Sequence, residues 1–226
     1  MQNLSPRIEK LWKLAGKCRC LGDVGTDHGF VPVRMVETGL AECAIASDIN
    51  KGPLERAKAH VEEAGLLDKI QLRLGSGMTV YKPGECDVFI IAGMGGLLIA
   101  DILQASRKVT ESADKLILQP NTCIPDFRKY LWDNGFTILD EDTLAEKEHT
   151  YIFLTVKYTG ETRTNYSQLA LEMGNILQGK PDGKIYYKAL YTKTTRKLEG
   201  MKKAANANQE EIRAAEELIK ALEEYL

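Results

Sequence analysis

Glycines and acidic side chains gather in the segment Asp23-Val24-Gly25-Thr26-Asp27-His28-Gly29, directly after a short apolar run. The glycines allow positive φ angles and let a ligand approach the backbone closely. A helix that begins after this segment would offer free N–H groups to a carboxylate or a phosphate. The segment therefore predicts a ligand-binding turn between a strand and a helix, although an ordinary turn has a similar composition.

The spacing of the glycines distinguishes between nucleotide cofactors. A dinucleotide site expects Gly-x-Gly-x-x-Gly, which Gly22, Gly25 and Gly29 do not provide. The methyltransferase pattern is acidic-x-Gly-x-Gly-x-Gly, and this chain matches it from Asp23 with Asp27 in place of the middle glycine. The pattern thus favours S-adenosylmethionine as cofactor. Its contacts in this turn would be Asp23, Gly25, Asp27, His28 and Gly29.

Two further turns are expected to complete the cofactor site. Asp48 ends the second predicted strand, at the distance where an acidic residue can bind both ribose hydroxyls. Its alternative role is to cap the helix that opens near Pro53. The segment Gly75-Ser76-Gly77 follows the third strand and would flank the adenine ring, or form a plain turn. The additional predicted cofactor contacts are Asp48, Ile49, Ser76 and Gly77.

Small residues follow the fourth predicted strand in the segment Ala92-Gly93-Met94-Gly95-Gly96. They clear the sheet edge where ligands bind in open α/β folds, or allow tight packing of strand on helix. Gln119-Pro120-Asn121 ends the fifth strand, where an amide can hydrogen-bond a base edge or the residues can form a turn. We assign Ala92, Gly93 and Met94 to the cofactor, and Gly95, Gly96, Gln119, Pro120 and Asn121 to the substrate.

A basic stretch lies between Lys180 and Lys203, with eight lysines and arginines against two acids. Three tyrosines are interleaved with the charges, and this mixture suits the backbone and bases of RNA. A solvated helical face with tyrosines in its seam would have the same composition. The candidate RNA contacts are Lys188, Lys193, Arg196 and Lys197.

The remaining composition argues against several classes of protein. The chain has 226 residues and a net charge of −2, without an apolar run that could cross a bilayer, so we expect a cytoplasmic protein without a membrane partner. Five cysteines without a Cys-x-x-Cys pair give little support for disulfides or a zinc ribbon. The three histidines show no metal-ligand spacing, and we expect no metal.

The elements that must position these segments alternate between strands and helices. Strands are predicted at 20–25, 44–49, 70–74, 87–91, 115–119, 137–144 and 151–158, and helices at 6–15, 32–38, 53–64, 96–106 and 125–134. Such alternation implies an α/β fold with a mostly parallel, Rossmann-like sheet. No helix separates the last two strands, so one of them should run antiparallel.

Beyond the last strand the pattern becomes purely helical, and a polar linker is expected at 159–164. We therefore divide the chain into a cofactor-binding domain, 1–160, and a helical domain, 161–226. A helical face is predicted for Tyr166, Leu169, Met173 and Ile176.

A three-four spacing of apolar residues then indicates a coiled-coil hairpin. Its turn should lie at Asn206-Ala207-Asn208, a poor helix interior. The predicted seam consists of Tyr191, Thr194, Leu198, Met201, Ala205, Asn208, Ile212, Ala215, Ile219, Leu222 and Leu226.

Taken together, these segments resemble the bacterial TrmK family, the tRNA (adenine-22 N1)-methyltransferases. The resemblance rests on 23–29, 91–96 and 116–121, and it extends to Asn134-Gly135-Phe136 and Tyr151. It covers nearly the whole chain, including a helical extension that is a coiled coil in that family. The chain departs from the family at Ser76, where Asp is usual, and at 122–125, where polar residues are usual.

The resemblance implies methyl transfer from S-adenosylmethionine to N1 of an adenine in tRNA. N1 carries a lone pair at neutral pH, so alignment rather than a strong base should supply most of the catalysis. Asp27 would stabilise the cationic product, and Asn121 is the second catalytic candidate. The base must be turned out of the folded tRNA, and Tyr151 would stack on it.

Two other functions remain open from the residues alone. A methyltransferase of small molecules or proteins would keep the cofactor site and use its C-terminal helices for dimerisation. A non-enzymatic RNA-binding protein would keep the fold without the cofactor. A nicotinamide oxidoreductase fits least, because the glycine spacing is wrong. We expect a monomer or a weak homodimer.

Overall fold

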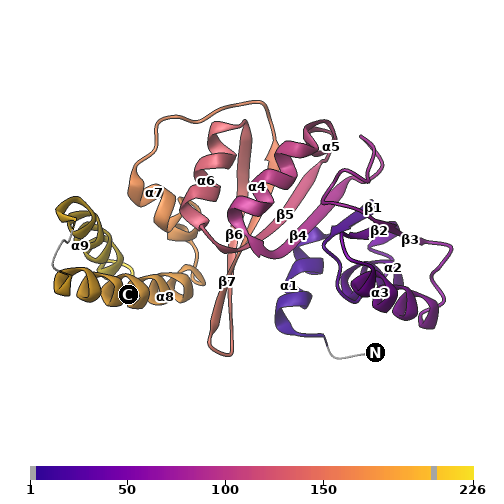
Figure 1. The fold of residues 1–226 in the computed structure, drawn as a ribbon, viewed down its shortest axis with the longest axis horizontal. Coiled ribbons are helices and arrows are strands. Elements are labelled where there is room, and N and C mark those ends of the chain that lie inside the picture. The colour runs from indigo at the N-terminus through magenta and orange to yellow at the C-terminus, as the bar shows by residue number, and fades with distance from the viewer. Residues whose placement is uncertain (1–3, 205–207) are drawn as a thin grey trace.

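A seven-stranded sheet with helices on both faces forms the centre of the computed structural model, which describes residues 4–204 and 208–226 (Figure 1). The strands are β1 (Cys18–Val24), β2 (Ala41–Asp48), β3 (Ile70–Leu74), β4 (Val88–Gly95), β5 (Lys115–Thr122), β6 (Phe136–Glu146) and β7 (His149–Tyr158). Their order is β3-β2-β1-β4-β5-β7-β6. Among these strands β7 alone is reversed and pairs antiparallel with both β5 and β6, which confirms the predicted Rossmann-like sheet with one reversed strand.

Alternate residues of each central strand enter two separate apolar clusters, one on each face of the sheet. In β4, Val88 and Ile90 pack on one side, whereas Phe89 and Ile91 pack on the other. All four are buried, because side chains of a strand alternate between faces and helices cover both of them.

Three helices cover the first face and three cover the second. The first group is α1 (Pro6–Ala15), α2 (Phe30–Glu37) and α3 (Lys51–Glu63). The second group is α4 (Gly96–Ala105), α5 (Arg107–Glu111) and α6 (Ile124–Asp133). The short helix α5 was not predicted, since its five residues leave too little room for a periodic apolar pattern.

The C-terminal part contains α7 (Gln168–Met173), a 3-10 turn (Leu177–Gly179), α8 (Gly183–Lys203) and α9 (Gln209–Glu223). The expected helical face from Tyr166 to Ile176 is wrong, because α7 has only six residues. Ser167 caps its start, and Gly174 ends it with a φ of 71°. A side chain at Gly174 would collide with Glu141 and Arg128 of the sheet domain, so only glycine fits at this position.

Helices α8 and α9 lie antiparallel to each other, beside the sheet domain (Figure 1). The Tyr187 and Tyr225 rings lie 5.3 Å apart, and Lys202 Nζ lies 2.7 Å from Glu216 Oε1. The two-helix arrangement is therefore confirmed, while a coiled coil in the strict sense stays a prediction.

The predicted seam needs three corrections. Leu226 is 52% exposed and lies beyond the end of α9. Leu218 is buried instead of Ile219, because α9 packs against α7 and the sheet domain as well as against α8. Asn208 is exposed and caps α9, its side chain accepting a hydrogen bond from Glu210 N at 2.9 Å. Ala205 and two residues of the expected turn, 206–207, lie outside the described residues.

The helical part shares the apolar cluster on the α4–α6 face, to which it contributes Met173, Tyr187 and Leu222. A buried ion pair lies beside this contact, with Arg128 Nε 2.8 Å from Glu141 Oε1. Arg128 Nη1 also donates to the carbonyl oxygens of residues 171 and 172. The domain division at residue 160 stays a prediction, but the two parts are joined by a common core.

Candidate active site

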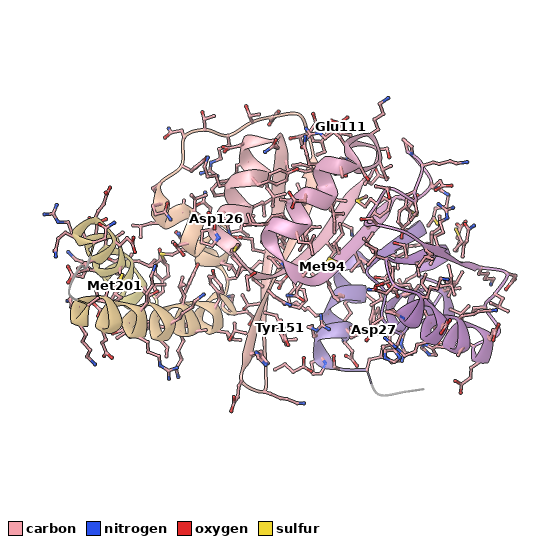
Figure 2. All side chains as sticks on the ribbon, in the orientation of Figure 1. Asp27, Met94, Glu111, Asp126, Tyr151 and Met201 are labelled. Atoms are coloured by element: carbon pink, nitrogen blue, oxygen red, sulfur yellow. The ribbon has the colours of Figure 1, made fainter. Side chains whose placement is uncertain are left out.

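The carboxyl ends of the parallel strands bring the predicted turns together along one edge of the sheet. Asp27, Met94 and Tyr151 all lie along this edge, close to α1, whereas Met201 lies far away on the helical hairpin (Figure 2). This is the edge where ligands bind in open α/β sheets. The fold therefore assembles the predicted cofactor and substrate segments at one place.

The turn after β1, from Gly25 to Gly29, contains two glycines with positive φ, and we call it the cradle. Gly25 has a φ of 78°, and a Cβ there would occupy the space of Met94 Cε. Gly29 has a φ of 67° and lies before the first turn of α2. The backbone N–H groups of Gly25 and Thr26 bond to Ser47 O, which ties this turn to β2. A small pocket of about 90 Å³ opens here between the turn and Arg7 of α1.

Asp48 lies at the end of β2, beside the turn that follows β3. Its Oδ1 accepts a hydrogen bond from Asn50 N at 2.7 Å, and its backbone oxygen accepts one from Gly75 N. The alternative role as a helix cap is wrong, because α3 begins at Lys51 with Asn50 as its N-cap and has no side-chain cap bond. Asp48 Oδ2 has no protein hydrogen bond among the described residues. Ile49 and Ser76 are exposed on the two adjacent turns, where they can still meet a ligand.

Burial raises the pKa of Asp23 to about 6, and the negative charge of Asp48 adds to the shift. Asp23 is the second-last residue of β1, lines the pocket at this turn, and is 8% exposed. A buried carboxylate favours the approach of a positive charge, because the cation restores part of the solvation that the carboxylate has lost. The site is therefore electrostatically prepared for a cationic ligand.

Asp27, a predicted catalytic residue, already forms an ion pair within the protein. Its carboxylate pairs with Arg56 of α3, and the His28 ring lies 3.5 Å away. The hydrogen bond from Arg56 lowers the pKa of Asp27. Its charge is already balanced, so a catalytic role for Asp27 stays a prediction that the geometry does not favour.

His28 lies in an aromatic row with Phe30 and His60. The His28 and Phe30 rings stack with centroids 5.1 Å apart, and His60 meets Phe30 edge-on at the same distance. His60 is half-buried, and its Nδ1 lies 3.0 Å from His28 O. This row holds the outer side of the turn in place.

A β-bulge at Gly93 organises the substrate side of the edge. The register between β4 and β5 shifts there, and Gly93 has a φ of 80°. Its backbone groups bond to side chains of β5: Gly93 N donates to Gln119 Oε1 at 3.1 Å, and Asn121 Nδ2 donates to Gly93 O at 2.8 Å. Gln119 and Asn121 are two residues apart on a strand, so both amides point to the same side. They also bond to each other, from Nε2 to Oδ1, at 2.8 Å.

Arg7 of α1 completes this network and was missed in the sequence. Its Nη1 donates to Gln119 Oε1 at 3.1 Å, and its guanidinium carbon lies 5.6 Å from the centre of the Tyr151 ring. No local signal identifies it, since an arginine in the first turn of an amphipathic helix usually faces water. Only the packing of α1 against β4 and β5 brings Arg7 to the edge.

The last glycines of the substrate segment serve close packing. A Cβ at Gly96 would lie 2.8 Å from both Phe127 Cβ and Thr122 O, and one at Gly95 would lie 3.1 Å from Thr122 Oγ1. The packing alternative therefore accounts for both glycines. Contacts with a substrate through their backbone stay a prediction, as does a contact of the buried Pro120.

A cleft of about 430 Å³ runs from the end of β5 to the helical hairpin. Asn121 lines one side, and Lys193 and Lys197 of α8 line the other. Burial raises the pKa of Glu172 in this cleft, against the attraction of the two lysines. Cys123 also lines the cleft and is exposed, unlike the buried Cys20 that typifies a thiol used for packing.

The four predicted RNA contacts do not share one face. Lys193 and Lys197 are one turn apart on α8 and both reach the cleft, whereas Lys188 lies nine residues before Lys197 and so points about 180° away. Arg196 is exposed and lies outside the cleft. The basic charge is confined to α8, because α9 carries five acidic and two basic residues. The hairpin has one basic and one acidic helix.

S-adenosylmethionine fits the cradle by three observations. A pocket of about 90 Å³ lies against the turn after β1, Asp48 keeps one oxygen for a ribose, and Asp23 supplies a buried negative charge for a cation. Within residues 4–204 and 208–226, no group of three or more metal-binding side chains is arranged around an ion site. None of the described helices is long and apolar enough to cross a membrane.

Comparison with known proteins agrees with this geometry. The family model described as a methyltransferase domain matches residues 4–154. The tRNA (adenine(22)-N(1))-methyltransferase of Bacillus subtilis (strain 168) is 35% identical over 174 residues, which cover 77% of this chain and 73% of that protein. This chain belongs to the TrmK family.

The likeness to solved TrmK structures extends over nearly the whole chain. The crystal structure of B. subtilis TrmK superposes with a TM-score of 0.83 at 29% identity and covers 99% of both chains. Sp1610 of Streptococcus pneumoniae, solved in complex with S-adenosyl-L-methionine, gives a TM-score of 0.81 at 32% identity, covering 98% of this chain and 99% of that one. The helical extension beyond residue 160 is therefore part of the TrmK architecture.

Proposed function

We infer that this protein methylates N1 of adenine 22 in tRNA, with S-adenosylmethionine as the methyl donor. One observation carries the inference: the glycine cradle after β1 and the amide pair of Gln119 and Asn121 lie on the same edge of the sheet. A turn suited to the cofactor and two amides suited to a base would thereby lie side by side. The membership of the TrmK family supports the same conclusion.

The residues of the cofactor side would hold and orient the donor. Asp48 Oδ2 is free to accept from a ribose hydroxyl, and the exposed Ile49 offers an apolar surface to a base. Asp23 lies where a cationic ligand would be attracted. When bound, S-adenosylmethionine supplies an electrophilic methyl group. The contacts of Ser76, Gly77, Ala92 and Met94 with the cofactor stay part of this proposal.

The residues of the substrate side would fix the base. Asn121 is exposed, whereas Gln119 is fully buried and supports it. Tyr151 lies half-buried at the start of β7, beside Arg7, and would stack on the base. Adenine N1 needs no deprotonation, so correct alignment can supply up to about 7–11 kcal/mol of the barrier reduction.

The RNA backbone would lie along the cleft that Lys193 and Lys197 line. The acidic helix α9 repels phosphate, so we restrict RNA binding to α8 and the cleft. We propose a cytoplasmic enzyme that acts as a monomer or weak homodimer without metal. The alternative of a methyltransferase for small molecules or proteins has no observation in its favour.

The test is methyl transfer from labelled S-adenosylmethionine to unmodified bacterial tRNA, with products identified by nucleoside mass spectrometry. We expect 1-methyladenosine, and its loss when guanine replaces adenine 22 in the transcript. Asn121→Ala should lower the transfer rate at least tenfold while cofactor binding persists. Cofactor binding without transfer to any tRNA would refute the proposed function and retain the fold assignment.

A further inference from the structure

The orientation of two amides at the end of β5 is fixed by their surroundings. A side-chain amide can rotate by 180° with little steric consequence, so only its hydrogen-bond partners decide which atom faces where. Gln119 Oε1 faces two groups that can only donate, the N–H of Gly93 and the guanidinium of Arg7, both at 3.1 Å. Gln119 must therefore direct its Nε2 towards Asn121.

The orientation of the Gln119 amide determines that of the Asn121 amide. Because Gln119 donates, Asn121 must present Oδ1 to it, at 2.8 Å, and its Nδ2 then donates to Gly93 O at 2.8 Å. An amide oxygen has two lone pairs, and only one of those on Asn121 Oδ1 is used. Asn121 is exposed towards the cleft, so its second lone pair is available to a ligand. The site thus offers a hydrogen-bond acceptor in a fixed place.

Adenine and guanine differ in what they present beside N1. Adenine carries a donor, the N6 amino group, whereas guanine and hypoxanthine carry an acceptor, the O6 oxygen. An acceptor on the protein therefore selects adenine. Since N6 is bonded to the ring carbon next to N1, holding N6 also fixes the direction in which the N1 lone pair points.

We propose that Arg7 is a positioning residue that fixes the orientation of the Gln119 and Asn121 amides, so that Asn121 Oδ1 accepts from the N6 amino group of the target adenine. The proposal rests on the proposed function. It assigns recognition of the base to a chain of hydrogen bonds that starts in α1, far from the β5 residues in sequence.

Arg7 is itself firmly held. The Tyr151 ring faces its guanidinium, and α1 is tied down at two further points. Lys10 Nζ lies 2.8 Å from Asp142 Oδ1, and Lys115 Nζ donates to Leu14 O at 3.2 Å. A guanidinium on a fixed helix can direct a partner, since it carries donors only and stays charged at every relevant pH.

The test couples a change in the protein to a change in the base. Arg7→Met keeps an unbranched apolar stem and removes the donors, and Arg7→Lys keeps a charged donor as the matched control. Each enzyme is assayed in single turnover on two tRNA transcripts, one with adenine and one with purine, which lacks the amino group, at position 22. The intrinsic difference in N1 reactivity between the two bases cancels when enzymes are compared.

We expect Arg7→Met to slow transfer to the adenine transcript by about 10- to 100-fold, the range for losing a hydrogen bond from a charged donor. The purine transcript should lose much less, so the preference for adenine over purine falls by at least about fivefold. Arg7→Lys should restore at least half of that preference. The Kd for S-adenosylmethionine, measured by calorimetry, should stay within about twofold for both variants.

Equal losses on both transcripts would overturn the proposal, because Arg7 would then act without regard to the amino group. A Kd for S-adenosylmethionine that rises with the loss of rate would also overturn it, assigning Arg7 to the cofactor. If Arg7→Met does not fold, Arg7→Lys is compared with the parent enzyme: we expect it to keep at least half of the preference for adenine, and a lost preference contradicts the donor role. A parent enzyme inactive on the adenine transcript would instead refute the proposed function.

Discussion

Replacing Asp23 by Asn should stabilise the protein while impairing its cofactor site. The residue is 8% exposed, and burial raises the pKa of its carboxyl from 3.8 to about 6. A rise of about two units corresponds to about 3 kcal/mol of unfavourable free energy for the ionised form in the folded state. The amide has nearly the same shape and carries no charge, so the D23N variant avoids this penalty.

The sign of the effect determines its pH dependence. Because the folded pKa of Asp23 lies above the unfolded one, its contribution to stability is fully present below about pH 4 and is lost as the pH rises through 6. The D23N variant should therefore gain up to about 3 kcal/mol in free energy of unfolding at pH 8, and about half as much at pH 5. Urea denaturation without cofactor at both pH values measures the difference.

A matched control is Asp114→Asn, because the Asp114 side chain is 78% exposed. This change should alter stability by less than about 0.5 kcal/mol at either pH. The D23N variant should bind S-adenosylmethionine more weakly than its parent, having lost the buried negative charge. A D23N variant less stable than its parent at pH 8, or equally stabilised at both pH values, would refute the electrostatic argument.

Three further changes probe other parts of the molecule. Arg128→Met should lower the free energy of unfolding by about 3–5 kcal/mol, since it leaves a buried carboxylate without its partner; thermal denaturation measures this. The double change Lys193→Gln and Lys197→Gln should weaken tRNA binding and lower the slope of log Kd against log salt concentration by the equivalent of about two phosphate contacts. Lys188→Gln should have less effect, and fluorescence anisotropy measures the binding of both variants. Gly96→Ala should force the turns after β4 and β5 apart, lowering kcat more than tenfold and stability by about 1–3 kcal/mol.

Controls and contrary outcomes are available for each. Adding Glu141→Leu to Arg128→Met should recover most of the lost stability, and a failure to do so would argue against the charge as the cause. Equal effects of Lys188 and the lysine pair on tRNA binding would contradict the assignment of the cleft. Gly200→Ala is the control for Gly96, because nothing lies within 4 Å of its added Cβ; equal activity of both variants would show that the tight turn is unimportant.

The backbone geometry of the predicted cofactor side could be foreseen because its signals are local, whereas its contacts with the cofactor stay a prediction. A glycine that must adopt a positive φ, as Gly25 does, and an acid at the end of a strand, as Asp48 is, lie within a few residues of their structural cause. The parallel sheet follows from the alternation of strands and helices, and it places the turns on one edge. Local chemistry and a regular topology were sufficient there.

The substrate side depends on contacts that are distant in sequence. Arg7 and Gln119 are 112 positions apart, and nothing near Arg7 announces the contact. The bulge at Gly93 is a property of the pairing between two strands, not of either strand alone. The early end of α7 has the same origin, since Gly174 is required by the Arg128–Glu141 pair against which it packs.

One error was avoidable from the sequence alone. The spacing of Lys188 and Lys197 places them on opposite sides of any straight helix, so the two could not serve one RNA groove. The acidic character of α9 was also visible in the sequence. A count of charges along the chain shows neither the face of a helix on which a lysine lies nor the difference in charge between the two helices.

The common core of the two parts has a consequence for how a target is chosen. Met173, Tyr187 and Leu222 pack into the same apolar cluster as the sheet domain, and Arg128 bonds to the backbone of α7. If Lys193 and Lys197 hold the RNA backbone as proposed, the distance from that grip to Asn121 cannot vary much. The enzyme then selects an adenine that lies at this fixed distance from a phosphate of the folded RNA. An unfolded RNA of the same sequence would be a poor substrate.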